Sequence, residues 1–385
     1  MQLFDSLLSM LRVAVGAVIL TLNIVLGLFS THVQVAPTAA PVEQATTTPP
    51  LASTVATTTS AEMRTPAPSV AKKAVPLAVP PTKPTATTTT PPVVVQTKSA
   101  DEVNTQTRAA LVNILCTTKA GGYLHPISGS GVMVSSAGVV LTNAHVAQYF
   151  LLRDFPTPGN IDCIVRTGSP AQATYRAELL YLPPAWINAN ANQITAAHAT
   201  GTGENDYAFL RITGTVRGAS LPAVLPFAPM TTDWPKKNDP VFLAAYPASF
   251  LDGSAIESSL NVISAFSAVE NLYTFGKDTV DVVSLGGNPV SQSGSSGGAA
   301  VRRQDGALFG LIATASPGDT TAARNLSAIT IDYIDRSLKN QGQGGIATLL
   351  LSDITKKAAE FAANTAPGLT QTLITALNAT STSSQ

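Results

Sequence analysis

The stretch "GSGVMVSSAGVVLTNAHV", residues 129–146, decides how the folded part of the chain is interpreted. Two runs rich in valine and leucine flank "SSAG" at 135–138, and this pattern predicts two β-strands joined by a tight turn. The second run leads directly to His145. A rigid hairpin of this kind can hold a histidine side chain in a fixed direction, which makes His145 a candidate catalytic residue.

The remainder of the region 105–340 has the same texture of short apolar runs between turn residues. This texture predicts further strands at "DYAFLRI" (206–212), "DPVFLAAYP" (239–247), "DTVDVVSL" (278–285) and "ALFGLIATAS" (307–316). No helical period persists before "IDYIDRSLKN" (331–340). We therefore expect one all-β domain, a sandwich or a barrel.

The loop "SQSGSSGGAAV", residues 291–301, contains a second chemical candidate, Ser296. Glycine and serine suit any turn, so the loop alone does not distinguish a nucleophile from a linker. A catalytic serine needs an adjacent base, usually a histidine held by a carboxylate. Gly294, Ser296 and Gly298 also fit the nucleophile elbow of α/β-hydrolases, but that fold places its histidine after the serine. No histidine follows Ser296, which excludes that fold.

The order histidine, aspartate, serine is present instead. Asp206 stands at the start of an apolar run, 61 residues after His145 and 90 residues before Ser296. This is one of the chain orders in which serine triads occur. His198, in "TAAH", lies only 8 residues before Asp206, too close to come from a separate strand, and is expected to be a loop residue. His125 precedes the hairpin and is expected to lie at a strand edge or turn.

The segments at 129–146, 205–212, 239–247 and 293–301 resemble, in this order, the signature segments of trypsin-like serine proteases. They are most similar to the bacterial high-temperature-requirement branch. The resemblance covers roughly 105–340 and implies two six-stranded antiparallel β-barrels with the active site in the cleft between them. Only about 45 residues follow position 340, so we expect no PDZ domain, although that branch usually carries one.

The resemblance implies a role for each candidate. Ser296 attacks the scissile carbonyl, His145 takes and returns the proton, and Asp206 orients the imidazole. The backbone N–H groups of Gly294 and Ser296 form the oxyanion hole. The expected activity is that of a serine endopeptidase, which hydrolyses peptide bonds through an acyl-enzyme. The alternative is a catalytically inactive, protease-like module that binds extended peptides on the cell surface.

The resemblance also implies where substrate lies. An extended polypeptide pairs as an added strand with Ala313, Thr314 and Ala315. Val290 corresponds to the base of the specificity pocket, with Ser291 beside it. No acidic residue occurs there, so we expect a small or medium aliphatic side chain before the cleaved bond, and not Lys or Arg.

The N-terminal segment 1–30 is predicted to be a transmembrane signal-anchor. Residues 13–29 carry no charge and are almost wholly apolar, which with the flanking residues is about the length that crosses a bilayer. The alternative is a cleaved secretory signal, with "PTAA" at 37–40 as the cleavage site. Arg12 before the apolar run favours a cytoplasmic N-terminus. We expect a single-pass protein of a bacterial cell envelope, with its protease domain outside the cytoplasm.

Residues 31–104 are predicted to form a disordered linker. Positions 31–100 hold 12 of the 27 prolines and no aromatic residue, so this segment cannot bury enough apolar surface to fold. His32 lies here and is an unlikely base. Lys plus Arg and Asp plus Glu balance at 23 each, so no excess of positive charge predicts nucleic-acid binding.

The last segment, 341–385, is predicted to be a helical tail. Apolar residues at helical spacing in 346–363 favour a helix docked on the domain over one that binds a partner. Cys116 and Cys163 are the two cysteines, and an exported domain permits a disulfide, but the sequence leaves open whether they pair. No motif predicts a metal site, and the expected chemistry needs no cofactor. The oligomeric state is not encoded in any visible pattern.

Overall fold

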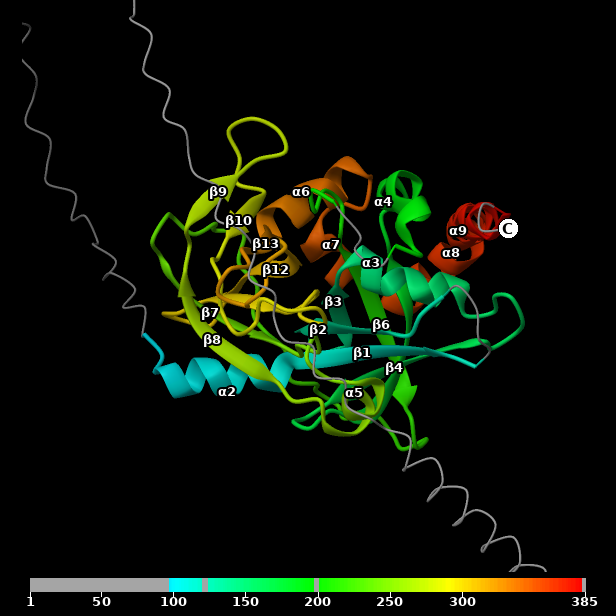
Figure 1. The fold of residues 1–385 in the computed structure, drawn as a ribbon, viewed down its shortest axis with the longest axis horizontal. Helices are drawn as coiled ribbons and strands as arrows, with labels where there is room; N and C mark the ends of the chain where they lie inside the picture. Colours follow the sequence, from blue (N-terminus) through cyan, green and yellow to red (C-terminus); the bar gives the residue numbers. More distant parts are fainter. Residues whose placement is uncertain (1–96, 120–123, 197–200, 383–385) are drawn as a thin grey trace, which may run out of the picture. The chain divides into compact units, whose positions relative to one another are not determined.

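A computed structural model describes residues 97–119, 124–196 and 201–382 (Figure 1). In the first half of this part, six strands close into an antiparallel barrel in the order β1-β2-β3-β6-β5-β4. The strands are β1 (Leu111–Thr118), β2 (Ile127–Ser135), β3 (Val139–Thr142), β4 (Ile161–Thr167), β5 (Gln172–Tyr181) and β6 (Ala208–Thr215). Short helical turns connect them: α3 (Ala144–Ala147), η1 (Gln148–Leu152), α4 (Pro184–Asn190) and η2 (Ala191–Gln193).

The predicted hairpin over 129–146 is confirmed. β2 ends at Ser135, β3 begins at Val139, and the two pair antiparallel. All four residues of β3 are buried, as expected for a short apolar strand inside a barrel. The barrel closes through β1, which pairs with β2 on one side and with β4 on the other.

The second half forms a seven-stranded antiparallel sheet in the order β8-β7-β11-β12-β13-β10-β9. Its strands are β7 (Pro240–Ala245), β8 (Ile263–Ala268), β9 (Asn271–Tyr273), β10 (Val282–Ser284), β11 (Ala299–Arg302), β12 (Leu308–Ala315) and β13 (Leu326–Thr330). The two edge strands, β8 and β9, do not pair with each other. The expectation of two six-stranded barrels is therefore confirmed for the first half, whereas the second half forms a half-barrel of seven strands. The strand count differs because one chain segment, interrupted only at Val269 and Glu270, supplies both β8 and β9. The second sheet has an apolar core of its own, which includes Val241, Leu243 and Phe309.

Helices flank the two sheets, and two of them, α2 and α5, were not expected from the sequence. α2 (Ala100–Ala110) precedes β1, and α5 (Gly253–Ser259) lies between β7 and β8. α6 (Ile331–Asn340) follows β13 and occupies the one helical segment that the sequence predicted in this region. The tail forms α7 (Ile346–Leu351), α8 (Ile354–Asn364) and α9 (Ala366–Thr382).

Helix α2 crosses the predicted boundary between linker and domain at 104/105, so the ordered part begins earlier than expected. The helix starts with a capping box: the Ser99 hydroxyl accepts from the Glu102 N–H at 3.2 Å, and the Glu102 carboxylate accepts from the Ser99 N–H at 2.7 Å. Its last turn is fixed by Arg108, which donates to the carbonyl of Val262 at 3.3 Å. The sequence prediction missed α2 because its buried face carries only one large apolar residue, Val103, beside Thr107 and Ala110.

The tail helices dock on the first barrel. α8 packs on β5, and α9 packs on η1 and α4. Phe361 of α8 is 6% exposed and stacks edge-on against Tyr181 of β5, with 6.1 Å between ring centroids. Leu373 of α9 is fully buried. The apolar face of the tail thus completes the core of the barrel.

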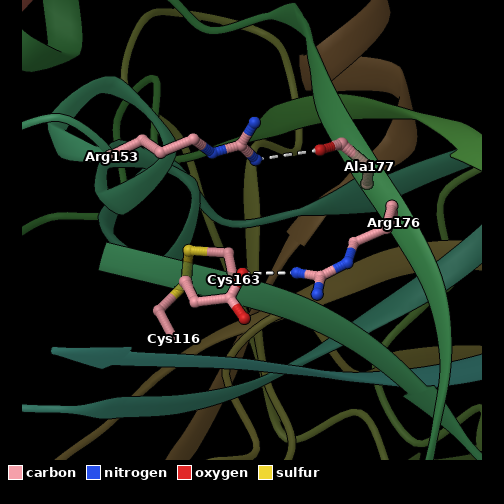
Figure 2. The surroundings of a disulfide bond; sticks show 6 residues. Cys116, Arg153, Cys163, Arg176 and Ala177 are labelled. Carbon is pink, nitrogen blue, oxygen red and sulfur yellow. Dashed lines mark hydrogen bonds and ion pairs between the residues drawn. A yellow bond between two sulfur atoms is a disulfide. The ribbon is translucent and has the colours of Figure 1, made fainter. Parts of the chain in front are cut away.

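Cys116 of β1 and Cys163 of β4 form a disulfide across the strand pair that closes the barrel (Figure 2). Both residues are buried, and the described part of the chain contains no free cysteine. Figure 2 also shows Arg153, which donates to the carbonyl of Ala177 at 3.2 Å above the bridge. The pairing that the sequence left open is therefore settled.

The predicted transmembrane segment, residues 13–29, and most of the predicted linker lie outside the described residues. Among the residues that the structure describes, no helix is long and apolar enough to span a membrane.

Candidate active site

His145 projects from the one-turn helix α3, directly after β3. Its ring Nδ1 lies 2.8 Å from Oδ2 of Asp206, and its backbone N–H donates to Oδ1 of the same carboxylate at 3.0 Å. Asn143 adds a bond from its side-chain amide to the Asp206 carbonyl at 2.7 Å. Three hydrogen bonds thus hold the end of β3 against the segment that carries the aspartate.

The His145 side chain is 27% exposed and that of Asp206 is 7% exposed. Burial disfavours protonation of the imidazole and is the largest single effect on it. The charge of Asp206 and its hydrogen bond act in the opposite direction and prevail, so the pKa of His145 is raised above its usual value. This geometry leaves Nε2 as the ring nitrogen free to exchange a proton with the cleft.

The segment before β6 is bent so that Asp206 can point at the histidine. Asn205 has a φ of +57°, in the left-handed region that asparagine tolerates better than most residues. Its backbone N–H donates to the Tyr333 hydroxyl at 3.0 Å, and its side-chain oxygen accepts from Ser337 at 2.8 Å. Both partners belong to α6, so the helix after the second sheet fixes the position of the acid.

Ser296 lies in the tight loop between β10 and β11. Gly294 and Gly297 have φ values of +89° and +86°. A Cβ at Gly297 would lie 1.9 Å from the carbonyl oxygen of Ser130, so this position admits only glycine. The loop therefore folds into a shape that other residues at these two positions would not allow.

Ser130 of β2 fastens this loop to the first barrel. Its backbone N–H donates to the Ser296 carbonyl at 2.7 Å, and its hydroxyl donates to the Gly294 carbonyl at 2.7 Å. The Tyr246 N–H donates in turn to the Ser130 hydroxyl at 2.9 Å. The sequence prediction did not single out Ser130, because no motif distinguishes it from other strand serines.

The backbone N–H groups of Gly294 and Ser296 have no acceptor among the described residues. The Ser296 hydroxyl donates to the carbonyl of Ala313 at 3.1 Å and not to His145. The loop thus presents two free backbone donors beside a serine whose hydroxyl is held by β12.

His145, Asp206 and Ser296 line one cleft of about 970 Å³, together with Gly294, Ala313 and Ala315. Thr314 lies between the last two in β12. Hydrogen bonds with β11 and the loop before it end at Ile312, and no strand of the described part pairs with 313–315 on that side. This edge of β12 is open to the cleft, and it carries the residues at which the resemblance implies substrate pairing.

Two predicted specificity residues do not reach the cleft. Val290 is fully buried in the core of the second sheet, and Ser291 is fully buried with its hydroxyl accepting from the Asn288 N–H at 3.1 Å. Arg324 and Asn325, which no motif had marked, line the same cleft as Ser296. The path of the loop between β12 and β13 brings these two residues to the cleft, and the sequence does not reveal that path.

Of the other histidines, His125 is exposed and does not line the cleft, whereas His32 and His198 lie outside the described residues.

Residues 129–311 match the family model of the trypsin-like peptidase domain. Among solved structures, the chain is similar to Deg5, with 17% identity and a TM-score of 0.41, over 61% of this chain and 90% of that chain. It is also similar to the serine endoprotease from Yersinia pestis, with 18% identity and a TM-score of 0.39, over 66% of this chain and 67% of that chain. The active form of the Rv3671c protease from M. tuberculosis has 18% identity and a TM-score of 0.40, over 71% of this chain and 96% of that chain. No curated protein sequence matches the chain significantly. The chain contains a trypsin-like peptidase domain, as the match over residues 129–311 shows.

Proposed function

We propose that this chain is a serine endopeptidase in which Ser296 is the nucleophile, His145 the general base and acid, and Asp206 the group that orients the histidine. The observation that carries the proposal is the 2.8 Å contact between His145 Nδ1 and Asp206 in the cleft that Ser296 also lines. The Asp206 carboxylate fixes the tautomer with the proton on Nδ1, which leaves Nε2 basic.

Substrate binding uses the open edge of β12. An extended peptide pairs with residues 313–315 as an additional strand, and its backbone N–H groups compete for the Ala313 carbonyl. That carbonyl holds the Ser296 hydroxyl in the free protein. A bound substrate therefore releases the hydroxyl, which turns toward Nε2 of His145.

Acylation then proceeds by attack of Ser296 Oγ on the scissile carbonyl carbon, while Nε2 of His145 takes the hydroxyl proton. The negative charge that forms on the carbonyl oxygen is stabilised by the N–H groups of Gly294 and Ser296. A single such donor is worth about 3–4 kcal/mol in the transition state. When the intermediate collapses, the C–N bond breaks, the leaving amine receives the proton from Nε2, and an acyl ester remains on Ser296.

Deacylation repeats these steps with water. His145 removes a proton from the water molecule as it attacks the ester carbon, and the same two N–H groups bind the oxyanion. The C–O bond to Ser296 breaks, the proton returns to Oγ, and the new carboxyl end of the peptide leaves. None of these steps needs a group beyond the residues of this cleft.

A catalytically inactive peptide-binding module is the second candidate, favoured by one observation. The Ser296 hydroxyl bonds to Ala313 and not to the histidine, so the nucleophile is not yet activated. In this alternative the open strand edge binds peptides and the serine never becomes acylated.

We further propose that residues 13–29 tether the protein to a membrane, with the peptidase domain outside the cytoplasm. The apolar run supports the tether. The disulfide between Cys116 and Cys163 supports an oxidising location, because such bonds persist mainly outside the cytosol.

The two candidates are separated by labelling the full-length protein with a fluorophosphonate and measuring its intact mass. The serine peptidase gains one adduct, because Oγ displaces fluoride at phosphorus. Ser296→Ala and His145→Ala abolish the adduct. Ser293→Ala is the matched control, since Ser293 lines the same cleft in an exposed position, and it labels like the wild type.

Absence of an adduct on folded wild-type protein contradicts the peptidase. Binding of an extended peptide to that unreactive protein, measured by fluorescence anisotropy, establishes the binding module. An adduct that survives in Ser296→Ala contradicts the assignment of the nucleophile.

A further inference from the structure

The guanidinium of Arg324 joins the two segments that flank the reacting centre. Its Nε donates to the Gly318 carbonyl at 2.9 Å, and its Nη1 donates to the Ser291 carbonyl at 3.2 Å. Ser291 lies five residues before Ser296, and Gly318 lies three residues after Ala315. Arg324 also lines the cleft that contains Ser296.

The positive charge of Arg324 is not neutralised within the described part of the chain, where no carboxylate forms an ion pair with it. Two of its five N–H groups have partners, which leaves three donors for a ligand. Two carboxylates line the cleft: Asp206 is bound to His145, and Glu204 is exposed on the loop before Asp206.

Asn325, the next residue, adds a donor to the lining of the same cleft. Its side-chain oxygen accepts from the Ser284 hydroxyl at 2.7 Å, so its amide N–H₂ faces away from that contact with no partner in the described part. Its backbone N–H donates to the Ser316 hydroxyl at 2.8 Å, which fixes the residue in place. The Glu270 carboxylate accepts from the same Ser284 hydroxyl at 3.3 Å.

We propose that these two residues select a carboxylate side chain in the residue before the cleaved bond, with Arg324 as the specificity-determining residue. The inference rests on the proposed peptidase function and replaces the aliphatic preference expected from the sequence. A guanidinium matches a carboxylate with paired N–H donors, and such charge-assisted bonds are the strongest that a side chain offers. An aliphatic side chain in the same place would leave these donors unpaired and desolvated, which is unfavourable.

The test uses the full-length protein and three quenched fluorescent peptides that are identical except for Glu, Gln or Leu before the scissile bond. For the wild type we expect kcat/KM for the Glu peptide to exceed that for Gln by at least about tenfold, as a charge-assisted contact requires. Arg324→Gln brings the Glu and Gln values together, so that the ratio of the two kcat/KM values falls to about one. Arg324→Lys, which keeps the charge without the planar fork, retains part of the preference.

Arg217→Gln is the matched control, because it removes one positive charge from an exposed residue that does not line the cleft. It leaves all three rates unchanged. Cleavage of the Leu peptide in preference to the Glu peptide by the wild type overturns the inference and leaves the peptidase function standing. A Glu preference that survives in Arg324→Gln also overturns it.

A binding measurement separates this inference from the proposed function. In Ser296→Ala, affinities for peptides that end in Glu or Gln are compared by fluorescence anisotropy, with and without Arg324→Gln. Tighter binding of the Glu peptide that depends on Arg324 supports the inference even when no peptide is hydrolysed and no fluorophosphonate adduct forms. Equal binding of the two peptides overturns it.

Discussion

Two opposing effects act on the pKa of the His145 imidazole: burial lowers it, and Asp206 raises it. Because Asp206 prevails, removing its charge is expected to lower the pKa of His145. We predict this lowering in Asp206→Asn, measured by NMR titration of the His145 ring in the full-length protein. The proposed peptidase also loses roughly 10⁴-fold in kcat, because the carboxamide no longer fixes the tautomer. An unchanged or higher pKa in Asp206→Asn contradicts the pairing.

The raised pKa of His145 also determines how the free energy of unfolding changes with pH. The pKa of His145 is raised in the folded state above its unfolded value of about 6.5. Its interaction with Asp206 therefore stabilises the fold fully below the unfolded pKa, and this contribution disappears as pH rises through the folded pKa. The gap in unfolding free energy between wild type and Asp206→Asn is expected to narrow as pH rises across that window. The wild-type peptidase activity rises over the same range, since the neutral imidazole is the base.

At the scale of residues, the sequence predicted those positions whose chemistry depends on type and order. A histidine after a hairpin, an aspartate before a strand and a serine between glycines could be recognised without knowing the path of any loop. Arg324 and Ser130 could not, because their importance comes from contacts between segments far apart in the chain. Likewise, the sequence alone did not show that Val290 is buried in the core of the second sheet.

At the scale of elements, α6 acts as the support for the segment that carries Asp206. Ser337 is 6% exposed, donates to Asn205, and accepts from the Tyr207 hydroxyl at 2.9 Å. We predict that Ser337→Ala lowers the free energy of unfolding by about 1–3 kcal/mol, because the buried Tyr207 hydroxyl and the half-buried Asn205 side chain each lose a partner. Denaturant unfolding measures this change.

Ser258→Ala on α5 is the matched control for that substitution. The Ser258 hydroxyl bonds a carbonyl of its own helix and is exposed, so its removal changes stability by less than about 0.5 kcal/mol. Ser337→Ala is also expected to lower kcat more than it raises KM, since it acts through Asp206 and not through the strand edge. Equal stability of the two variants would show that α6 does not support this segment.

The elements that the sequence predicted are those with a clear apolar pattern, such as β3, β12 and α6. The second sheet was harder to predict. β9 has three residues that are all exposed, so no alternation of apolar and polar residues reveals it, whereas β10 lies within the strand predicted at 278–285. Whether a sheet closes depends on how its edge strands meet, and this is not encoded in either strand alone.

At the scale of the whole molecule, the disulfide ties together the two strands that close the first barrel. Cys116 and Cys163 are separated by 47 residues, and a loop of this length lowers the entropy of the unfolded chain. We predict that Cys116→Ala with Cys163→Ala lowers the free energy of unfolding by about 4 kcal/mol, the value that loop-closure entropy gives for this separation. Denaturant unfolding of the full-length proteins measures the difference.

A reducing agent supplies the control for that experiment, because it opens the bridge without changing the sequence. We expect it to destabilise the wild type by a similar amount and to leave the double variant unaffected. A double variant as stable as the oxidised wild type would mean that the barrel closes without help from the bridge. A domain whose stability depends on this disulfide needs an oxidising compartment. This requirement agrees with the proposed tether, which would place the domain outside the cytoplasm. Thiol trapping in intact cells should therefore find Cys116 and Cys163 oxidised, and a reduced pair would contradict the proposed location.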